Sequence, residues 1–199
     1  MEHRFQVILA ALLATAMLAI SGCSQQPPAS LQGSMRSLPF SVVATGDSGA
    51  DMKNASTFAW ARNLQQSSLD QSPGNVPVDV LVQEAIIATL QGKGYRYSPV
   101  PGEGDLIITY RVALDNTDTG RESAGAYPGL LQPSLNLASP DPGKYEKGTL
   151  DIEVTERSSG LTAWRSALQG FASLELTDAE RRQRIGLMVD RMLDGVPAK

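Results

Sequence analysis

The sequence predicts an α+β domain in which a mostly antiparallel β-sheet carries two amphipathic helices packed on one face. Three observations give this prediction. Short segments alternate apolar and polar residues, two longer segments repeat apolar residues at helical spacing, and one tight turn joins two alternating segments into a hairpin. The predicted order is β-β-α-β-β-β-β-α, within residues 38–199.

Two strands are predicted at the start of this domain. Residues 38–45 and 57–61 are rich in β-branched and aromatic side chains, and a turn rich in Gly, Asp and Ser separates them. Residues 63–76 are polar and contain a Pro-Gly pair, so we expect a loop there.

The first helix is predicted to begin at Pro77, because the first turn of a helix does not need the N–H that proline lacks. Gly92 and Gly94 are expected to end it. The side chains that recur at i, i+3 and i+4 spacing are Val78, Leu81, Val82, Ala85, Ile86, Thr89 and Leu90.

Two more strands are predicted after this helix, a short one at residues 95–97 and a central one at residues 106–114, where every second residue is apolar. Residues 115–147 break the pattern with frequent Gly, Pro, Ser and Asn. A loop this long inside a compact domain is more often functional than filler.

A hairpin and a second helix complete the prediction. Residues 149–155 alternate cleanly, residues 158–160 supply a turn, and residues 161–172 form the returning strand. Residues 177–180 have the capping-box pattern Thr-x-x-Glu, which satisfies free N–H groups at the start of a helix. The apolar face of that helix comprises Ile185, Met188, Val189, Met192 and Val196.

The first 22 residues have the pattern of a secretory signal peptide. An apolar run at residues 5–20 follows a short polar start, and it is too short and poorly flanked for a spanning helix. The residues Ile20, Ser21, Gly22 and Cys23 then resemble a lipobox, in which the cysteine receives a diacylglycerol. We therefore expect cleavage before Cys23; a free thiol or an intermolecular disulfide fits its position less well.

Acyl chains on Cys23 would hold the protein to a membrane, because each buried methylene contributes about 0.8 kcal/mol. By resemblance to Gram-negative lipoproteins, Ser24 favours the outer membrane, with the domain facing the periplasm, over retention in the inner membrane. Residues 23–37 are expected to form the lipidated N-terminus and a flexible linker, since Ser, Gln, Pro and Gly dominate them.

Composition restricts the chemistry of the mature protein. Cleavage removes His3, the only histidine, and acylation occupies the only cysteine. The mature protein then has no histidine and no free cysteine for hydrolysis or for zinc binding. We therefore expect no enzyme activity, no cofactor and no metal. The formal net charge of −4 makes nucleic acid a poor partner.

Two pairs of residues are candidates for a site. Asp151 and Glu153 share the outward face of one strand and could support acid/base or metal chemistry, although a solvated strand face explains them as well. Trp60 and Trp164 could line an apolar pocket, but aromatic residues in strands mostly fill cores. Arg165 is expected to lie on the opposite face from Trp164 and to pair with Glu153.

Partner contact is predicted at two places. A basic patch at the start of the second helix could touch lipid phosphate or a protein, with a solvated helix face as the alternative. The long loop could contact a partner or ligand, with a disordered insert as the alternative. The residues concerned are Arg181, Arg182 and Arg184 in the patch, and Tyr127, Leu130, Leu131 and Tyr145 in the loop.

The order and spacing of five motifs resemble the DUF4136 family of bacterial lipoproteins. The motifs are TFAW at 57–60, LQGKGY at 90–95, DLIITY at 105–110, YEKGTL at 145–150 and GLTAWR at 160–165. The resemblance extends over about residues 38–196, and the chain departs from it in the long insert before Tyr145 and in Phe58, where tyrosine is frequent. Because the family's function is unassigned, the resemblance implies a fold and a location but no catalytic residue.

These features together predict a lipid-anchored lipoprotein of the cell envelope, with a non-enzymatic binding or structural role toward an envelope protein or lipid. The alternative is a carrier of apolar ligands or an accessory protein of lipid transport. A hydrolase that uses carboxylates alone is the third hypothesis, and it requires two acids that converge in one cleft.

Overall fold

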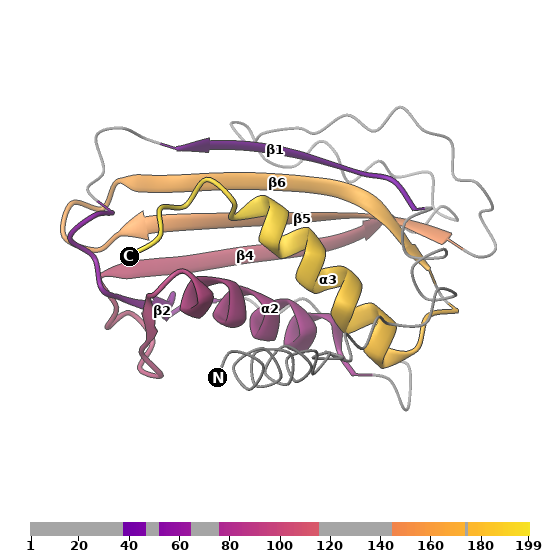
Figure 1. Ribbon diagram of the computed structural model, residues 1–199, viewed down its shortest axis with the longest axis horizontal. Coiled ribbons are helices and arrows are strands. Elements are labelled where there is room, and N and C mark those ends of the chain that lie inside the picture. Colours follow the sequence, from indigo (N-terminus) through magenta and orange to yellow (C-terminus); the bar gives the residue numbers. More distant parts are fainter. Residues whose placement is uncertain (1–37, 47–51, 65–75, 116–144, 174) are drawn as a thin grey trace, which may run out of the picture.

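The computed structural model describes residues 38–46, 52–64, 76–115, 145–173 and 175–199, which form a six-stranded sheet with two helices across one face (Figure 1). The predicted α+β class and order of elements are confirmed. The elements are β1 (Phe40–Gly46), β2 (Thr57–Trp60), α2 (Val78–Gly92), β3 (Arg96–Tyr97), β4 (Leu106–Asp115), β5 (Tyr145–Glu156), β6 (Thr162–Ser173) and α3 (Asp178–Met192).

Several predictions fall outside the described residues. They concern the signal peptide, the lipobox with Cys23, the linker, and loop residues Tyr127, Leu130 and Leu131. Among the residues that the structure describes, no helix is both long and apolar enough to cross a membrane.

The strand order in the sheet is β1-β6-β5-β4-β2-β3. Strands β4, β5 and β6 form an antiparallel centre, and β1 adds antiparallel to β6. The short strand β2 runs parallel to both β3 and β4, so the sheet is mixed. Helix α2 makes this possible, because parallel neighbours require a long crossover connection, which a helix commonly supplies.

Strand β5 begins at Tyr145 and not at the predicted position 149. Its first residues pair on both sides, with Lys147 opposite Asp115 of β4 and Phe171 of β6. Backbone pairing with two neighbours therefore outweighs the weak strand propensity of Gly148, and the predicted loop over residues 115–147 is too long by three residues at this end.

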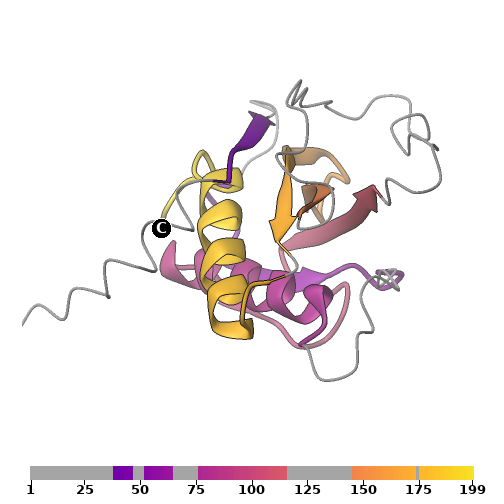
Figure 2. The same cartoon turned by 90° about the vertical axis from the view of Figure 1, so that its right-hand side faces the viewer.

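The core lies between the sheet and the two helices, which Figure 2 shows on the same side of the strands. Each central strand contributes alternate side chains, and the helices contribute theirs at helical spacing. Fully burying one such side chain stabilises the fold by about 1.5–3 kcal/mol. The core includes Leu106, Ile108 and Tyr110 of β4, Leu150, Ile152 and Val154 of β5, Val82, Ile86 and Leu90 of α2, and Met188, Val189 and Met192 of α3.

Both tryptophans pack in or against this core. Trp60 is buried, with its ring 5.7 Å from that of Tyr110. Trp164 is half-buried, and its Nε1–H donates a hydrogen bond to the carbonyl of Met192 at 3.0 Å. The aromatic side chains thus join strands to each other and to α3, as expected of core residues.

The ends of the helices follow the predicted signals. Thr177 and Glu180 form the capping box of α3. Gly94, two residues after α2, has a φ of +94°, in the left-handed region that favours glycine. A Cβ at this position would lie 2.8 Å from the Cβ of Lys199, so glycine also allows the two segments to approach.

A carboxylate joins the starts of the parallel strands β2 and β4. Asp105 Oδ2 accepts hydrogen bonds from the Ser56 N–H at 2.8 Å, the Thr57 N–H at 3.0 Å and the Thr57 hydroxyl at 2.8 Å. The N–H of Asp105 in turn donates to Thr57 Oγ1 at 3.0 Å. These bonds, led by the one from Ser56, hold the pKa of Asp105 below its ordinary value.

The substitution Asp105→Ala is expected to lower the free energy of unfolding by about 1–3 kcal/mol at pH 7, because two backbone N–H groups lose their acceptor. Since the folded-state pKa is depressed, the charge-dependent contribution is present above the unfolded pKa of about 3.9. It is lost as pH falls through the folded value. Urea unfolding at pH 7 and near pH 3 measures the free energy of unfolding of the variant and of the wild type. The difference between them should be smaller near pH 3, and a difference that pH leaves unchanged would contradict the contribution of the Asp105 charge.

Candidate functional site

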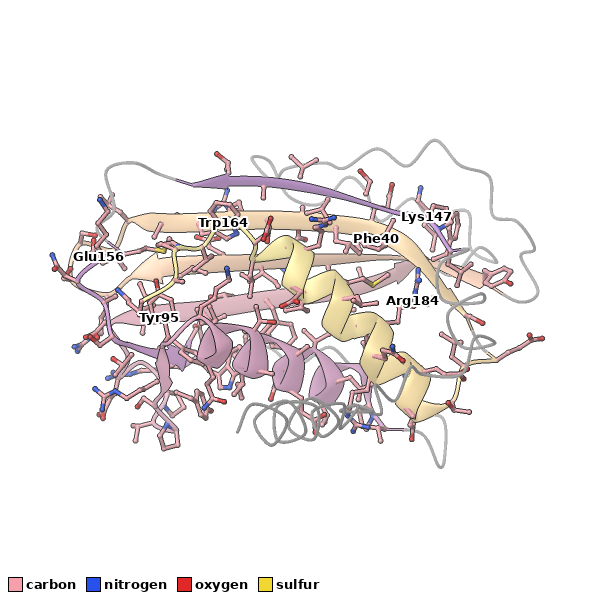
Figure 3. All side chains as sticks on the ribbon, viewed as in Figure 1. Phe40, Tyr95, Lys147, Glu156, Trp164 and Arg184 are labelled. Carbon is pink, nitrogen blue, oxygen red and sulfur yellow. The ribbon has the colours of Figure 1, made fainter. Side chains whose placement is uncertain are left out.

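The three arginines of the predicted basic patch do not share one surface. Arg184 is only 6% exposed, and its Nη2 donates to the carbonyls of Leu38 and Phe171, both at 3.1 Å. Figure 3 shows Arg184 and Phe40 at the same end of the sheet, opposite to Tyr95 and Glu156. Burial lowers the pKa of Arg184. This side chain joins α3 to β6 and to the residue from which the described domain begins.

The other two arginines pair with different acids. Arg181 lies 3.3 Å from Asp178 on the same helix, and Arg182 lies 3.0 Å from Glu84 of α2. Helical periodicity explains the outcome, because position 184 lies on the same side of α3 as the core residues Met188 and Met192. The predicted patch is therefore corrected: the structure buries one of its three members.

The expected pair on the face of the sheet away from the two helices is present. Arg165 Nη2 lies 2.9 Å from Glu153 Oε2, and the Thr162 hydroxyl donates to Glu153 Oε1 at 2.7 Å. Asp151, on the same face, has a pKa raised by burial, while the positive charges of Arg111 and Arg165 act in the opposite direction. The two carboxylates thus stand among cations of neighbouring strands, and Glu153 is already bound.

No group of three or more His, Cys, Asp or Glu side chains is placed to hold a metal ion within the described residues. Tyr145, the described member of the predicted loop contacts, begins β5 opposite Ser173 and is half-buried. Partner contact by the loop stays a prediction, because its other three residues lie outside the described ranges.

A buried polar network links α2 to the central sheet. The Tyr110 hydroxyl donates to Asp79 Oδ1 at 3.1 Å and accepts from Gln83 Nε2 at 2.7 Å. Burial first, together with the nearby Asp79 charge, raises the pKa of Tyr110 to about 12. The phenol stays protonated at physiological pH, so it acts as a structural donor. Sequence periodicity could not reveal this network, because Asp79 has the ordinary pattern of a first-turn acid.

Within the part of the chain that the structure describes, an open groove between β1 and α3 is the candidate for a binding site. It has a volume of about 480 Å³ and is lined by Phe40, Val42, Ala44 and Arg191. Alternate side chains of β1 give an apolar floor, and the guanidinium of Arg191 supplies a positive charge. Leu187, one helical turn before Arg191, is 56% exposed and adds an apolar side chain to the same side of α3.

Sequence reasoning missed this groove. Apolar residues occupy positions 40, 42 and 44, but such a pattern ordinarily indicates burial under a helix. The missing information is where α3 crosses the sheet. Helix α3 runs diagonally across the sheet (Figure 1). Its residue Arg191 lines the groove beside β1.

The fold defines this molecule as a small helix-covered mixed-sheet domain. Its sequence matches the family model described as Domain of unknown function (DUF4136) over residues 42–198. The chain therefore belongs to the DUF4136 family, and the predicted family membership is confirmed. No curated protein matches the sequence.

The chain is similar to several solved structures, among them the following three. A DUF4136 family protein from Bacteroides thetaiotaomicron is 18% identical, with a TM-score of 0.48, and the match covers 78% of this chain and 94% of that one. A PelC dodecamer from Paraburkholderia phytofirmans is 10% identical, with a TM-score of 0.47 and coverage of 81% and 99%. A PDZ domain protein from Parabacteroides distasonis is 19% identical, with a TM-score of 0.42 and coverage of 81% and 36%.

The different environments of two nearby arginines predict different costs of removal. Arg184→Ala is expected to lower the free energy of unfolding by about 2–4 kcal/mol, because two carbonyls lose a buried charged donor. Arg182→Ala, the matched control on the same helix, breaks an exposed ion pair and should cost less than about 1 kcal/mol. Urea unfolding of both variants measures the difference, and equal losses would contradict the buried position of Arg184.

Proposed function

We propose that this protein is a lipid-anchored lipoprotein of the cell envelope whose α+β domain binds an envelope partner without catalysing a reaction. The observation that carries the anchoring is the sequence of Ile20, Ser21, Gly22 and Cys23 at the end of an apolar run. Acyl chains on Cys23 hold the protein to the outer membrane, and the domain faces the periplasm.

The position at which the described domain begins supports this proposal. About 14 residues separate Cys23 from Leu38, and at about 3.4 Å per residue they reach at most about 50 Å when fully extended. Leu38 is buried, and Arg184 binds its carbonyl. The chain from the anchor therefore enters the domain at a fixed point beside β1.

The distribution of side chains supports binding over catalysis. The carboxylate of Glu153 is held by Arg165 and Thr162, so it is occupied in contacts within the domain. The groove of Phe40, Val42, Ala44 and Arg191 instead combines apolar surface with one charge. Sites of that composition orient a bound molecule by a few polar groups and hold it by apolar contact.

Two substitutions test the anchoring. Cys23→Ala is expected to release the protein from the membrane fraction, because no residue remains to carry the acyl chains. Ser24→Asp should leave the protein lipidated but move it to the inner-membrane fraction. Fractionation of cells that produce each variant, followed by immunoblotting, measures both results. Retention of Cys23→Ala in the outer membrane would exclude the proposed anchor.

A second candidate function, the carriage of an apolar ligand, is favoured by the same groove. Its apolar side chains suit the chain of an amphiphile, and Arg191 suits the carboxylate or phosphate of its head group. Native mass spectrometry of the purified protein distinguishes the two functions. A non-covalent lipid adduct would support carriage, whereas the bare mass of the acylated chain would favour the binding of a partner.

A further inference from the structure

Strand β1 is the outermost strand of the described sheet, and one of its edges has no neighbouring strand there (Figure 1). On its other side it pairs with β6 in an unbroken register from Phe40–Gly170 to Gly46–Trp164. At the opposite edge of the sheet, β3 has only two residues. Among the described residues, the longer edge without a neighbouring strand therefore belongs to β1.

Strand β1 lacks the features by which proteins ordinarily prevent pairing at an edge. Its sequence FSVVATG contains no charged side chain and no proline, and its pairing with β6 has no bulge. The second half of the strand is exposed, including Val43 at 37%. Such an edge is a template for another strand.

The sequence of β1 also complements itself. In an antiparallel pair centred on Val43, each Phe40 stands opposite a Gly46, which has no side chain. Each Val42 stands opposite the smaller Ala44. Ser41 stands opposite Thr45, so their hydroxyl side chains meet, and Val43 stands opposite Val43 of the other copy. Large residues face small ones, and no charges meet along the strand.

We propose that β1 pairs antiparallel with β1 of a second copy of this chain, with Val43 at the twofold axis. The axis is perpendicular to the sheet, so the helices of both copies lie on the same side of one continuous sheet. The two grooves then lie beside each other across the axis, on the helix side of the joined sheet. Arg191 of each copy lies on this shared side.

The contact between two β1 strands is small, so we expect it to form mainly between copies that are held on the same membrane. A pair of seven-residue strands buries less than the roughly 1,200–2,000 Å² of a stable interface, so free copies associate weakly. Copies that share a bilayer meet at a much higher effective concentration. This step rests on the proposed lipid anchor. In this pair the two Phe40 residues are six positions apart along the strands, or about 20 Å at about 3.4 Å per residue. The linkers between Cys23 and Leu38, each up to about 50 Å long, can therefore join both copies to one membrane.

Cysteine cross-linking of the full-length protein in cells tests the pairing and its register. Val43→Cys is expected to give a disulfide-linked dimer under mild oxidation, because residues facing each other in a pair lie about 4.5–5.5 Å apart. Ser41→Cys alone, or Thr45→Cys alone, should give at least tenfold less disulfide-linked dimer than Val43→Cys. In each of these dimers the two introduced thiols lie about four residues apart along the strands. Co-production of the Ser41→Cys and Thr45→Cys chains should restore the dimer.

A second substitution checks that the cross-link depends on the pair. Val43→Lys in both of those chains places like charges at the axis and should reduce the mixed dimer at least tenfold. Val43 is partly exposed, so the fold should tolerate the change, and circular dichroism of the purified variant verifies it. Equal cross-linking at positions 41, 43 and 45, or a cross-link from position 43 to another protein, would overturn the proposal.

Fractionation of the same cells separates this proposal from the anchor. Membrane-bound Val43→Cys protein without a dimer would overturn the strand pairing and leave the anchor intact. Soluble protein that still forms the register-specific dimer would overturn the anchor and leave the strand pairing intact. The wild-type chain, whose only cysteine is Cys23, is the control for disulfides that do not involve β1.

Discussion

The structure depends on the register of β5 between β4 and β6. In this register Leu150, Ile152 and Val154 face the helices, and Asp151 and Glu153 face the other side. A shift by one residue would place the carboxylates in the core, which no single hydrogen bond could offset. The same register sets Arg165 opposite Glu153, so the packing of one face and the charge pairing of the other have a common cause.

Both described helices lie on one face of the sheet, and their placement there explains the position of the candidate groove. Helix α2 packs over the β2 side of the sheet, and α3 crosses toward β1 without covering it fully (Figures 1 and 2). The apolar side chains of β1 are therefore shared between the core and the groove. Arg184 fixes the entry of the chain beside this strand. Any anchor before residue 38 is thus connected to β1, the outermost strand of the sheet that the structure describes.

Local patterns predicted much of the fold, and long-range contacts decided the rest. Alternation identified the hairpin of β5 and β6, and Thr177 with Glu180 identified the start of α3, because these signals act between near neighbours. The parallel pairing of β2 depends on residues about 48 positions away, through Asp105. The burial of Arg184 and the groove beside Arg191 depend on the crossing of α3, which no local pattern encodes. The lipid anchor is a prediction of sequence alone.

The register of β5 is the central claim, and a comparison of Ile152→Ala with Glu153→Ala tests it most directly by the free energy of unfolding in urea. Ile152 is fully buried, so its truncation should cost about 2–5 kcal/mol, whereas loss of the partly exposed Glu153 should cost less than about 1 kcal/mol. Similar costs for the two variants, or a larger cost for Glu153→Ala, would contradict the assignment of the two faces.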